Sequence, residues 1–554
     1  MTTKRLAVYV GIAFIAFLAF FLLASFSTTK GDQGTRAAGD YQGAGNCQGC
    51  HSEEYDGWDA TNHGSVFKPT AEFYIEWVAG NRSNSCMSCH VAGYNKTTIG
   101  GYDPAFLWND TVNSNNANLL GIQCENCHGP DPMSNADRTN TFKQTDPAVC
   151  TQCHSGSRHP QYTEWNSSAH AKDPPAYVKN LACAKCHEAK LAGEYLSDGT
   201  EPTALPANPR WQLTCATCHD PHNGTNAGQL RRPVQDLCGA CHNGDNAQPE
   251  QGAVHHPMLD MRQGTANVPV PSSQTMAEVY CAQCHRRTYD YNSSLAPRAM
   301  SGHDFKQRPE ACVECHDGTG GFAMDVDQAE NTIHYWQAST SNNLVNARAI
   351  LDDAWVSYNA ADSYGFNPDT KSLAWEYYLQ ANYSASFVEA DGSMGAHNFQ
   401  YANSLLTFAN LKAGQVIVML TPGTFSGKVV DASGNPVAGV QITAGGKVWA
   451  TSAADGTFSF KHAPGSFTFS LVQGGKEVGI AEGAITSGQT TDVRAMIGAP
   501  SGGQTQQAPA ADQTLQYLTM LLLIVAIVLI IVLMAISRRK PTASEPKAEK
   551  EESQ

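Results

Sequence analysis

All the cysteines of this 554-residue chain follow one repeated pattern. The eighteen cysteines form nine C-x-x-C pairs, and a histidine directly follows every pair. The pairs are Cys47 and Cys50, Cys86 and Cys89, Cys124 and Cys127, Cys150 and Cys153, Cys183 and Cys186, Cys215 and Cys218, Cys238 and Cys241, Cys281 and Cys284, and Cys312 and Cys315. The histidines are His51, His90, His128, His154, His187, His219, His242, His285 and His316. Because the chain has only 19 histidines, chance does not produce nine such successions, and the pattern specifies a chemical function.

The sequence C-x-x-C-H is the attachment motif of c-type haem. Two thiols form thioether bonds to the haem vinyl groups, and the adjacent histidine offers an imidazole nitrogen to the iron. A thioredoxin-like site needs one cysteine pair and no histidine, and zinc ribbons use pairs two at a time and would leave the ninth pair over. A disulfide framework would not keep one spacing throughout. The sequence therefore predicts nine covalently bound haem c groups, with the motif histidines as proximal iron ligands.

Ten histidines lie outside the motifs. His462 belongs to a β-rich segment far along the chain, and we expect it at the surface. The other nine are candidates for the distal iron position: His63, His159, His170, His222, His255, His256, His303, His334 and His397. Nine irons with one proximal histidine each need nine distal ligands to be six-coordinate. The equal numbers favour ligation over the ordinary role of histidine as a polar surface or core residue.

Three of these distal candidates leave alternatives open. His255 and His256 are adjacent, so one of them is a candidate bystander, and His334 could instead be a helix residue packed near haem. If one of them does not ligate, one iron is five-coordinate or takes Met258 or another group. An iron that is closed on both faces only passes electrons, whereas an open one can carry out oxidation-reduction chemistry.

Both ends of the chain contain an apolar run of membrane-spanning length. The run Leu6 to Phe26 follows two basic residues, which predicts a signal sequence or an N-terminal membrane anchor over residues 1–27. Residues 515–536 are uncharged and precede a basic cluster, which predicts a transmembrane helix with residues 537–554 in the cytoplasm. The body of the protein is then expected on the outer side of the membrane.

Composition divides the rest of the chain into five segments. Residues 28–45 are a polar, glycine-rich linker, and residues 46–324 carry the motifs, whose starts are 23 to 43 residues apart. Few long apolar runs occur there, so we expect short helices and long loops wrapped around haem. Residues 325–414 place apolar residues at three- and four-residue intervals, which predicts helices that pack on the haem region. Residues 423–496 have strand-like alternation, and residues 497–514 are a flexible linker.

The segment CQGCHSEEYDGWDATNH resembles the first haem site of a known cytochrome superfamily. That superfamily contains the tetrahaem cytochrome of ammonia oxidisers, octahaem hydroxylamine oxidoreductases and pentahaem nitrite reductases. There, a tryptophan and then an axial histidine follow the motif, and Trp58 and His63 match them. The stretch CTQCHSGSRHPQYTEWNSSAH repeats the arrangement with Trp165 and His170. The segments CENCHGPD, CATCHDPH, SGHDF before PEACVECHDG, and GSMGAHNFQYANSLL are also similar, and they imply distal roles for His222, His303 and His397. The resemblance covers residues 46–411.

The chain departs from the catalytic members of that superfamily. Pentahaem nitrite reductases carry lysine in place of the motif histidine at the catalytic haem, and no C-x-x-C-K occurs in this sequence. Hydroxylamine oxidoreductases link a tyrosine covalently to the active haem, and no pattern singles out one of the 20 tyrosines. Arg286, Arg287, Tyr289 and Tyr291 follow the eighth motif and could line a substrate pocket. Arginines that pair with haem propionates are the more general interpretation.

The stretch GKVVDASGNPVAGVQI, together with ATSAADGTFSF, resembles the carboxypeptidase regulatory-like fold, a small transthyretin-like sandwich. The second stretch has a hairpin-like pattern with Asp455-Gly456 as its turn. The resemblance implies no catalysis. We expect this module to be a spacer or contact domain that lifts the haem region off the membrane.

The predicted fold is a mainly α, loop-rich multihaem cytochrome c domain with a C-terminal helical segment, followed by a small all-β sandwich and a C-terminal transmembrane helix. We expect a membrane-anchored cytochrome that transfers electrons along packed haems. Its expected partners are a quinol-oxidising membrane complex or another cytochrome, and an extracellular or envelope redox acceptor. The alternative is an oxidoreductase that acts on a small nitrogen or sulfur compound, of the hydroxylamine, nitrite or tetrathionate type, at one open haem. The formal charge of −15 argues against a nucleic-acid partner.

Overall fold

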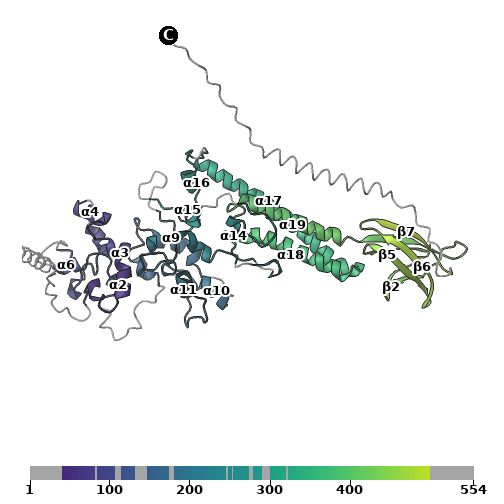
Figure 1. Cartoon of the computed structure of the whole chain (residues 1–554), viewed down its shortest axis with the longest axis horizontal. Helices are drawn as coiled ribbons and strands as arrows, with labels where there is room; N and C mark the ends of the chain where they lie inside the picture. The colour runs from purple at the N-terminus through teal and green to yellow at the C-terminus, as the bar shows by residue number, and fades with distance from the viewer. Residues whose placement is uncertain are drawn as a thin grey trace, which may run out of the picture.

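The computed structural model describes residues 40–80, 84–105, 114–130, 146–173, 180–244, 247–251, 254–273, 279–289, 300–319 and 322–498. The molecule is elongated, and its parts follow one another along the long axis in chain order (Figure 1). The nine motifs lie toward one end, long helices form the middle and β-strands form the other end. The predicted order of a loop-rich region, a helical segment and a β region is therefore confirmed.

The motif region consists of short helices joined by long loops, as predicted. Its described α-helices are α2 (Ser52–Asp59), α3 (Asn62–Ser65), α4 (Glu72–Val78), α5 (Met87–His90), α6 (Ser114–Asn118), α7 (Cys124–His128), α8 (Ala148–Thr151), α9 (Gln161–Ser167), α10 (Leu181–His187), α11 (Ala189–Asp198), α12 (Cys215–Cys218), α13 (Val234–Leu237), α14 (Met258–Gln263), α15 (Cys281–His285) and α16 (Glu310–Cys315). Seven 3-10 turns join them: η1 (Ala44–Asn46), η2 (Asn84–Cys86), η3 (Thr97–Ile99), η4 (Ala169–Ala171), η5 (Ala227–Gln229), η6 (Cys238–Ala240) and η7 (Pro249–Gln251). Within its described part, the hydrophobic cluster around the second motif has only five buried residues. Side-chain packing among these residues therefore supplies only a small part of a core.

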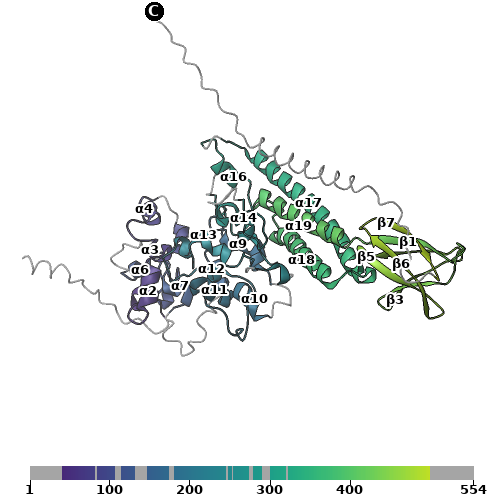
Figure 2. The ribbon, with the colours of Figure 1, turned by 45° about the vertical axis from the view of Figure 1, so that its right-hand side comes forward.

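Three long helices form the middle of the molecule: α17 (Val326–Ala360), which continues into the 3-10 helix η8 (Ala361–Tyr364), α18 (Pro368–Asp391) and α19 (Phe399–Met419). Asp325, Asn367 and Asn398 cap the three N-termini, and each side chain accepts a hydrogen bond from the backbone N–H three residues later. Such caps satisfy backbone donors that have no partner inside the helix. The helices run side by side in both views (Figures 1 and 2). The helical segment thus extends five residues beyond the predicted end at residue 414.

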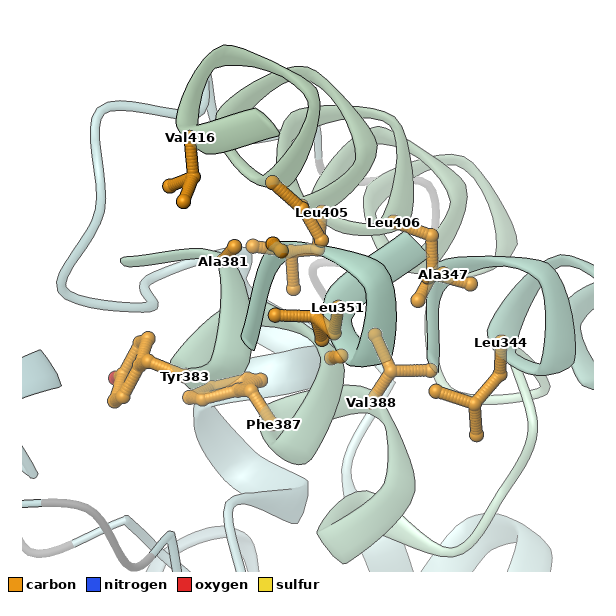
Figure 3. Packing of buried hydrophobic residues seen from close by; sticks show 14 of the residues in the cluster. Leu344, Ala347, Leu351, Ala381, Tyr383, Phe387, Val388, Leu405, Leu406 and Val416 are labelled. Carbon is orange, nitrogen blue, oxygen red and sulfur yellow. The ribbon is translucent and has the colours of Figure 1, made fainter. Parts of the chain in front are cut away.

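The bundle has a continuous apolar core. On α17, Leu344, Ala347, Leu351 and Ala354 are buried at the three- and four-residue spacing that the sequence predicts. They belong to the same cluster as buried residues of α18 and α19, among them Leu405 (Figure 3). Complete burial of a large apolar side chain stabilises a fold by about 1.5–3 kcal/mol. The bundle is therefore a rigid platform next to the motif region.

The segment 254–273 attaches the bundle to the motif region. Val268 and Val270 pack against the bundle core, and the Tyr401 hydroxyl accepts a hydrogen bond from the backbone N–H of Ala266 at 2.9 Å. The side-chain amide of Asn398 donates to the backbone carbonyl of Ser273. These contacts hold the turn between α18 and α19 against the motif region.

Seven strands form the last part of the described chain: β1 (Gly423–Val430), β2 (Gln441–Ala444), β3 (Lys447–Thr451), β4 (Thr457–His462), β5 (Gly465–Gln473), β6 (Lys476–Ile485) and β7 (Thr490–Met496). They make a three-stranded sheet in the order β4-β1-β7 and a four-stranded sheet in the order β3-β2-β5-β6. Buried residues of both sheets share one core around Phe425, Phe469 and Leu471. All pairings are antiparallel except that of β1 with β7.

The prediction of a hairpin at Asp455-Gly456 is wrong. The turn forms, with the Asp455 carboxylate accepting from the backbone N–H of Thr457 at 3.1 Å, but the strands on its two sides do not pair. Strand β3 pairs with β2, and β4 pairs with β1 in the other sheet. Local turn chemistry does not decide between a hairpin and a connection from one sheet to the other.

The expectation that His462 lies at the surface is also wrong. His462 is only 5% exposed and packs against Trp449 at a ring-centroid distance of 4.3 Å. The side chains of both residues pack against the backbone of Gly365, which follows η8. In addition, the backbone N–H of Ala463 donates a hydrogen bond to the carbonyl of Tyr364 at 2.7 Å. The β region therefore docks on the end of the bundle, and this contact buries a polar residue that local sequence places outside.

Within the described ranges, no helix combines the length and the apolar character needed to cross a bilayer. The apolar runs expected to enter the membrane, residues 6–26 and 515–536, lie outside the described residues.

Candidate haem sites

The sites are numbered 1 to 9 in the order of their motifs. Several motifs lie on a single turn of helix, as in α7, which contains Cys124, Cys127 and His128. Residues at positions i, i+3 and i+4 share one helix face, so both thiols and the imidazole can reach one ligand. None of the eighteen cysteines, all of which are described, takes part in a disulfide bond. Their sulfur atoms are therefore available for thioether bonds.

Histidine rings from outside the motifs face seven of the nine motif rings. The ring centroids of these pairs are 6.0–6.3 Å apart. The pairs are His90 with His159 at 6.3 Å, His128 with His222 at 6.0 Å, His154 with His63 at 6.1 Å, His219 with His303 at 6.1 Å, His242 with His170 at 6.1 Å, His285 with His397 at 6.0 Å, and His187 with both His255 at 6.3 Å and His256 at 6.1 Å.

This spacing fits an iron atom between the two rings. A metal–imidazole bond is about 2 Å and the nitrogen lies about 1.1 Å from the ring centre, so rings on opposite sides of one iron have centroids about 6.2 Å apart. Aromatic pairs in proteins generally spread over about 4.5–7 Å. Each of the seven motif rings has a partner at 6.0–6.3 Å, and two of them, His154 and His242, also have a second histidine ring nearby at 5.8 and 5.7 Å. The residues present therefore fit an iron porphyrin held by two imidazoles.

Site 5 has two histidines opposite its motif ring. His255 and His256 are 3.9 Å apart, and their ligand atoms and that of His187 all lie within 4.8 Å of one another. His256 has a φ of 50°, which is uncommon for a residue other than glycine. This backbone turn lets two successive side chains lie together. Because one axial position is available there, one of the two rings is a neighbour of the ligand and not a ligand of the same iron.

Sites 1 and 9 have no histidine ring opposite the motif histidine, although all 19 histidines lie among the described residues. The ring of His316 instead meets Phe322 edge-on at 5.3 Å, and His51 lies 3.9 Å from the exposed Glu54. His334 is on the outer face of α17, where its side chain is 65% exposed and lies 4.0 Å from Glu330. The structure thus brings eight of the nine distal candidates to motif rings and leaves His334 apart.

Burial favours the neutral, metal-binding form of several imidazoles at these sites. Burial, and then the nearby rings of His154 and His219, lowers the pKa of His63 to about 4. Burial also lowers the pKa of His242 to about 4 and that of His303 to about 3. These groups are therefore uncharged at neutral pH.

Three family models match the motif region. The model "Cytochrome c554 and c-prime" matches residues 46–129, "Cytochrome c3" matches residues 117–198, and "Doubled CXXCH motif" matches residues 209–247. The chain belongs to the multihaem c-type cytochromes. This agrees with the cytochrome superfamily that the sequence resembles, whereas the carboxypeptidase regulatory-like resemblance of the β region has no match among these models.

Known relatives of the cytochrome are similarly distant. Multiheme cytochrome MtrA of Shewanella baltica is 25% identical over 48% of this chain and 86% of its own length. C-type polyheme cytochrome OmcB of Geobacter sulfurreducens is 25% identical over 63% of this chain, which spans half of OmcB. Cytochrome c-554 of Nitrosomonas europaea is 29% identical over 19% of this chain and 45% of its own. Among solved structures, outer cell wall cytochrome OcwA is 22% identical, with a TM-score of 0.46 over 67% of this chain and 99% of that one.

The cytochrome contains two equivalent three-site units, sites 1–3 and sites 4–6. In the first unit, the indole N–H of Trp58 donates to the carbonyl of Ile122 at 2.9 Å, two residues before Cys124. In the second, Trp165 donates to the carbonyl of Leu213 at 2.8 Å, two residues before the first cysteine of site 6. Each buried tryptophan thus ties the first motif of its unit to the third.

Hydrogen bonds and electrostatic interactions between cysteines of different motifs indicate which sites are neighbours in space. A main line runs through sites 1, 3, 4, 6, 7, 8 and 9, while site 2 adjoins site 4 and site 5 adjoins site 7. The neighbouring cysteines along the line are Cys47 and Cys124, Cys127 and Cys150, Cys150 and Cys215, Cys218 and Cys238, Cys238 and Cys281, and Cys284 and Cys312. The side branches join through Cys89 with Cys153 and Cys186 with Cys241. Spatial order therefore differs from chain order.

Hydrogen bonds to Nδ1 orient several rings, and sequence reasoning missed these partners. Nδ1 of His219 lies 2.6 Å from the carbonyl of Gly228, and Nδ1 of His285 lies 2.9 Å from that of Phe305. Nδ1 of His397 lies 2.5 Å from the carboxylate of Asp391. Such partners fix which nitrogen carries the proton and leave Nε2 for the metal. No sequence motif marks these partners, because carbonyls and a distant carboxylate carry no local pattern.

Two of the residues after the eighth motif lie beside site 9. Arg287 forms an ion pair with Glu314 of the ninth motif, and its Nε is buried with no described hydrogen-bond partner. The hydroxyl of Tyr289 is likewise buried beside Arg287, whose guanidinium lies over the tyrosine ring, and burial raises the pKa of Tyr289. Haem propionates would supply acceptors for such donors. Tyr291, predicted to belong to the same group, lies outside the described residues.

Proposed function

We propose that the chain is a nonahaem electron conductor. The observation that carries the proposal is the set of seven motif rings faced by a second imidazole at 6.0–6.3 Å. In the proposal, the eighteen motif cysteines hold nine haem c groups by thioether bonds and the nine motif histidines bind the irons from one face. The facing histidines bind seven of them from the other. Haem supplies a one-electron redox centre, and an iron closed on both faces exchanges electrons without binding substrate.

The order of the sites supports transfer along a line. The cysteines of sites 1, 3, 4, 6, 7, 8 and 9 interact in succession, some through side-chain hydrogen bonds and others electrostatically, so attached haems would be neighbours in the same order. The cysteines at the two ends are accessible, since Cys50 and Cys315 are the two exposed motif cysteines. We therefore assign electron entry and exit to sites 1 and 9.

The cellular setting belongs to the same proposal. Residues 515–536 anchor the cytochrome in the cytoplasmic membrane, with residues 537–554 inside and the haem region outside. The β region spaces the haem region from the membrane. The partners are a quinol-oxidising membrane complex or another cytochrome on one side and an extracellular redox acceptor on the other.

A second candidate function is favoured by the absence of a facing histidine at sites 1 and 9. An iron bound on one face only can take a small nitrogen or sulfur compound, such as hydroxylamine, nitrite or tetrathionate, at the other. Site 9 has Arg287 and Tyr289 beside it, which would offer charge and a hydrogen-bond donor to such a ligand. In this reading, the seven closed sites carry electrons to or from the reaction.

Two measurements on the purified full-length protein test these proposals. Mass spectrometry should give the mass of the mature polypeptide plus nine haems, and a smaller haem number contradicts the conductor as described. Electron paramagnetic resonance and magnetic circular dichroism should then show seven irons with two histidine ligands, and carbon monoxide should bind at most two irons after reduction. Steady turnover of nitrite, hydroxylamine or tetrathionate that is lost on carbon monoxide binding would establish the second candidate. Electron transfer without such turnover would support the electron conductor and contradict the second candidate function.

A further inference from the structure

The distal histidine of site 8 has a buried carboxylate as its hydrogen-bond partner. Asp391 is the last residue of α18, and His397 lies in the turn before α19. The Asp391 side chain is fully buried and accepts a hydrogen bond from Nδ1 of His397 at 2.5 Å. Ser393 also donates to this carboxylate through its hydroxyl, and its hydroxyl oxygen accepts from the backbone N–H of His397 at 3.1 Å. The turn therefore fixes both the ring and its partner.

Both rings of site 6 have neutral partners at the same nitrogen: Nδ1 of the motif ring His219 donates to the backbone carbonyl of Gly228, and Nδ1 of the facing ring His303 lies 2.9 Å from the hydroxyl of Ser301. The motif ring of site 8, His285, also donates to a carbonyl, that of Phe305. A carboxylate attracts the Nδ1 proton more strongly than a carbonyl or a hydroxyl does. The imidazole then becomes a stronger electron donor through Nε2, which favours the oxidised iron. The positive charge of Arg262 acts on His397 in the opposite sense, but it makes no direct hydrogen bond to the ring.

We propose that Asp391 gives the haem of site 8 a lower reduction potential than the closed sites whose histidines have neutral partners, and thereby sets an uphill step between site 9 and the rest of the line. This inference rests on the proposed haem ligation. Site 8 adjoins site 7 through Cys281 and Cys238, and it adjoins site 9 through Cys284 and Cys312. Among the described cysteines, those of site 9 interact with a cysteine of site 8, so in the proposed order site 8 lies between site 9 and the rest of the line.

The substitution Asp391→Asn tests the inference, because asparagine keeps the shape and removes the charge. In a spectroscopic redox titration of the full-length holoprotein, one haem in nine should move to higher potential while the other eight keep theirs. Asp391→Glu keeps a carboxylate and should return that haem toward the wild-type value. The matched control is Glu389→Gln, which removes an exposed carboxylate two residues earlier on α18 that pairs with Arg348 and does not touch His397. It should leave all nine potentials unchanged.

The result that overturns the inference is a titration of Asp391→Asn that superimposes on wild type in a protein that still holds nine haems. A haem number below nine in wild type would instead contradict the proposed function, so the two failures are distinguishable. If Asp391→Asn does not accumulate, near-infrared magnetic circular dichroism of the wild-type protein decides the point. One closed site should then show a charge-transfer band displaced from the other six, as a more strongly donating imidazole requires. Seven coincident bands would overturn the inference as well.

Discussion

Replacing Gly57 by alanine should open site 3 without touching any ligand. Gly57 lies in α2, and a Cβ built on it would stand 1.8 Å from the backbone carbonyl oxygen of His222. Real Cβ atoms essentially never come closer than 3.0 Å to another heavy atom, so the His222 segment must retreat by at least 1.2 Å. A metal–ligand bond tolerates about 0.2 Å. The imidazole of His222 should therefore lose its position opposite His128, at present 6.0 Å away.

The stability change has two opposing parts. Alanine is more favourable than glycine within a helix by about 0.5–1 kcal/mol. An overpacked contact costs about 1–3 kcal/mol, and the segment has little room to move because Gly224 already packs against the backbone of Ala60. We expect a net loss of about 0.5–2 kcal/mol and the conversion of one iron in nine to the high-spin form.

The assay combines haem content, low-temperature electron paramagnetic resonance and carbon monoxide binding in Gly57→Ala, with Gly45→Ala as control. A Cβ on Gly45 would have no neighbour within 4 Å, so this variant should match wild type in all three measurements. The reasoning is refuted if Gly57→Ala has the wild-type spectrum, binds no additional carbon monoxide and melts at the wild-type temperature.

Three further changes probe the framework of the cytochrome. Leu405→Ala empties a fully buried position in the bundle and should cost about 2–5 kcal/mol in chemical denaturation followed by far-ultraviolet circular dichroism, whereas Leu411→Ala, which is 57% exposed, should cost little. Asp325→Ala removes the cap of α17 and should cost about 0.5–2 kcal/mol in the same experiment; an unchanged midpoint would contradict the capping role. Trp165→Phe removes the hydrogen bond to Leu213 and should cost about 1 kcal/mol beyond lost packing, with Trp58→Phe behaving alike if the two three-site units are equivalent.

Much of this architecture could be predicted from local patterns. The spacing C-x-x-C-H directly specifies a ligand set on one helix turn, and the interval of apolar residues from Leu344 to Ala354 specifies a buried helix face. The similar stretches around Trp58 and Trp165 indicated a repeated arrangement, and the structure gives both indoles an equivalent carbonyl partner. These features depend on residues that are close in sequence.

Features that depend on distant contacts could not be predicted. The facing histidines come from segments more than 60 residues away from their motif rings. The equal numbers of histidines inside and outside the motifs therefore identified candidate distal ligands, but not which ligand faces which motif ring. Asp391 is one of 51 acidic residues, and only the turn between two helices brings it to His397. His462 is covered by the end of the bundle, and the strands around Asp455 separate into two sheets for reasons that arise in the completed fold.

The long intervals between facing histidines have a consequence for biogenesis. If the chain emerges N-terminus first, the motif histidines His90 and His128 emerge well before their facing partners His159 and His222. His285 emerges before His397 by an interval that includes the two long helices α17 and α18. If haem is attached as each motif emerges, attachment at these motifs would precede the arrival of the second imidazole, and the interval is longest for His285, which is 112 residues before His397.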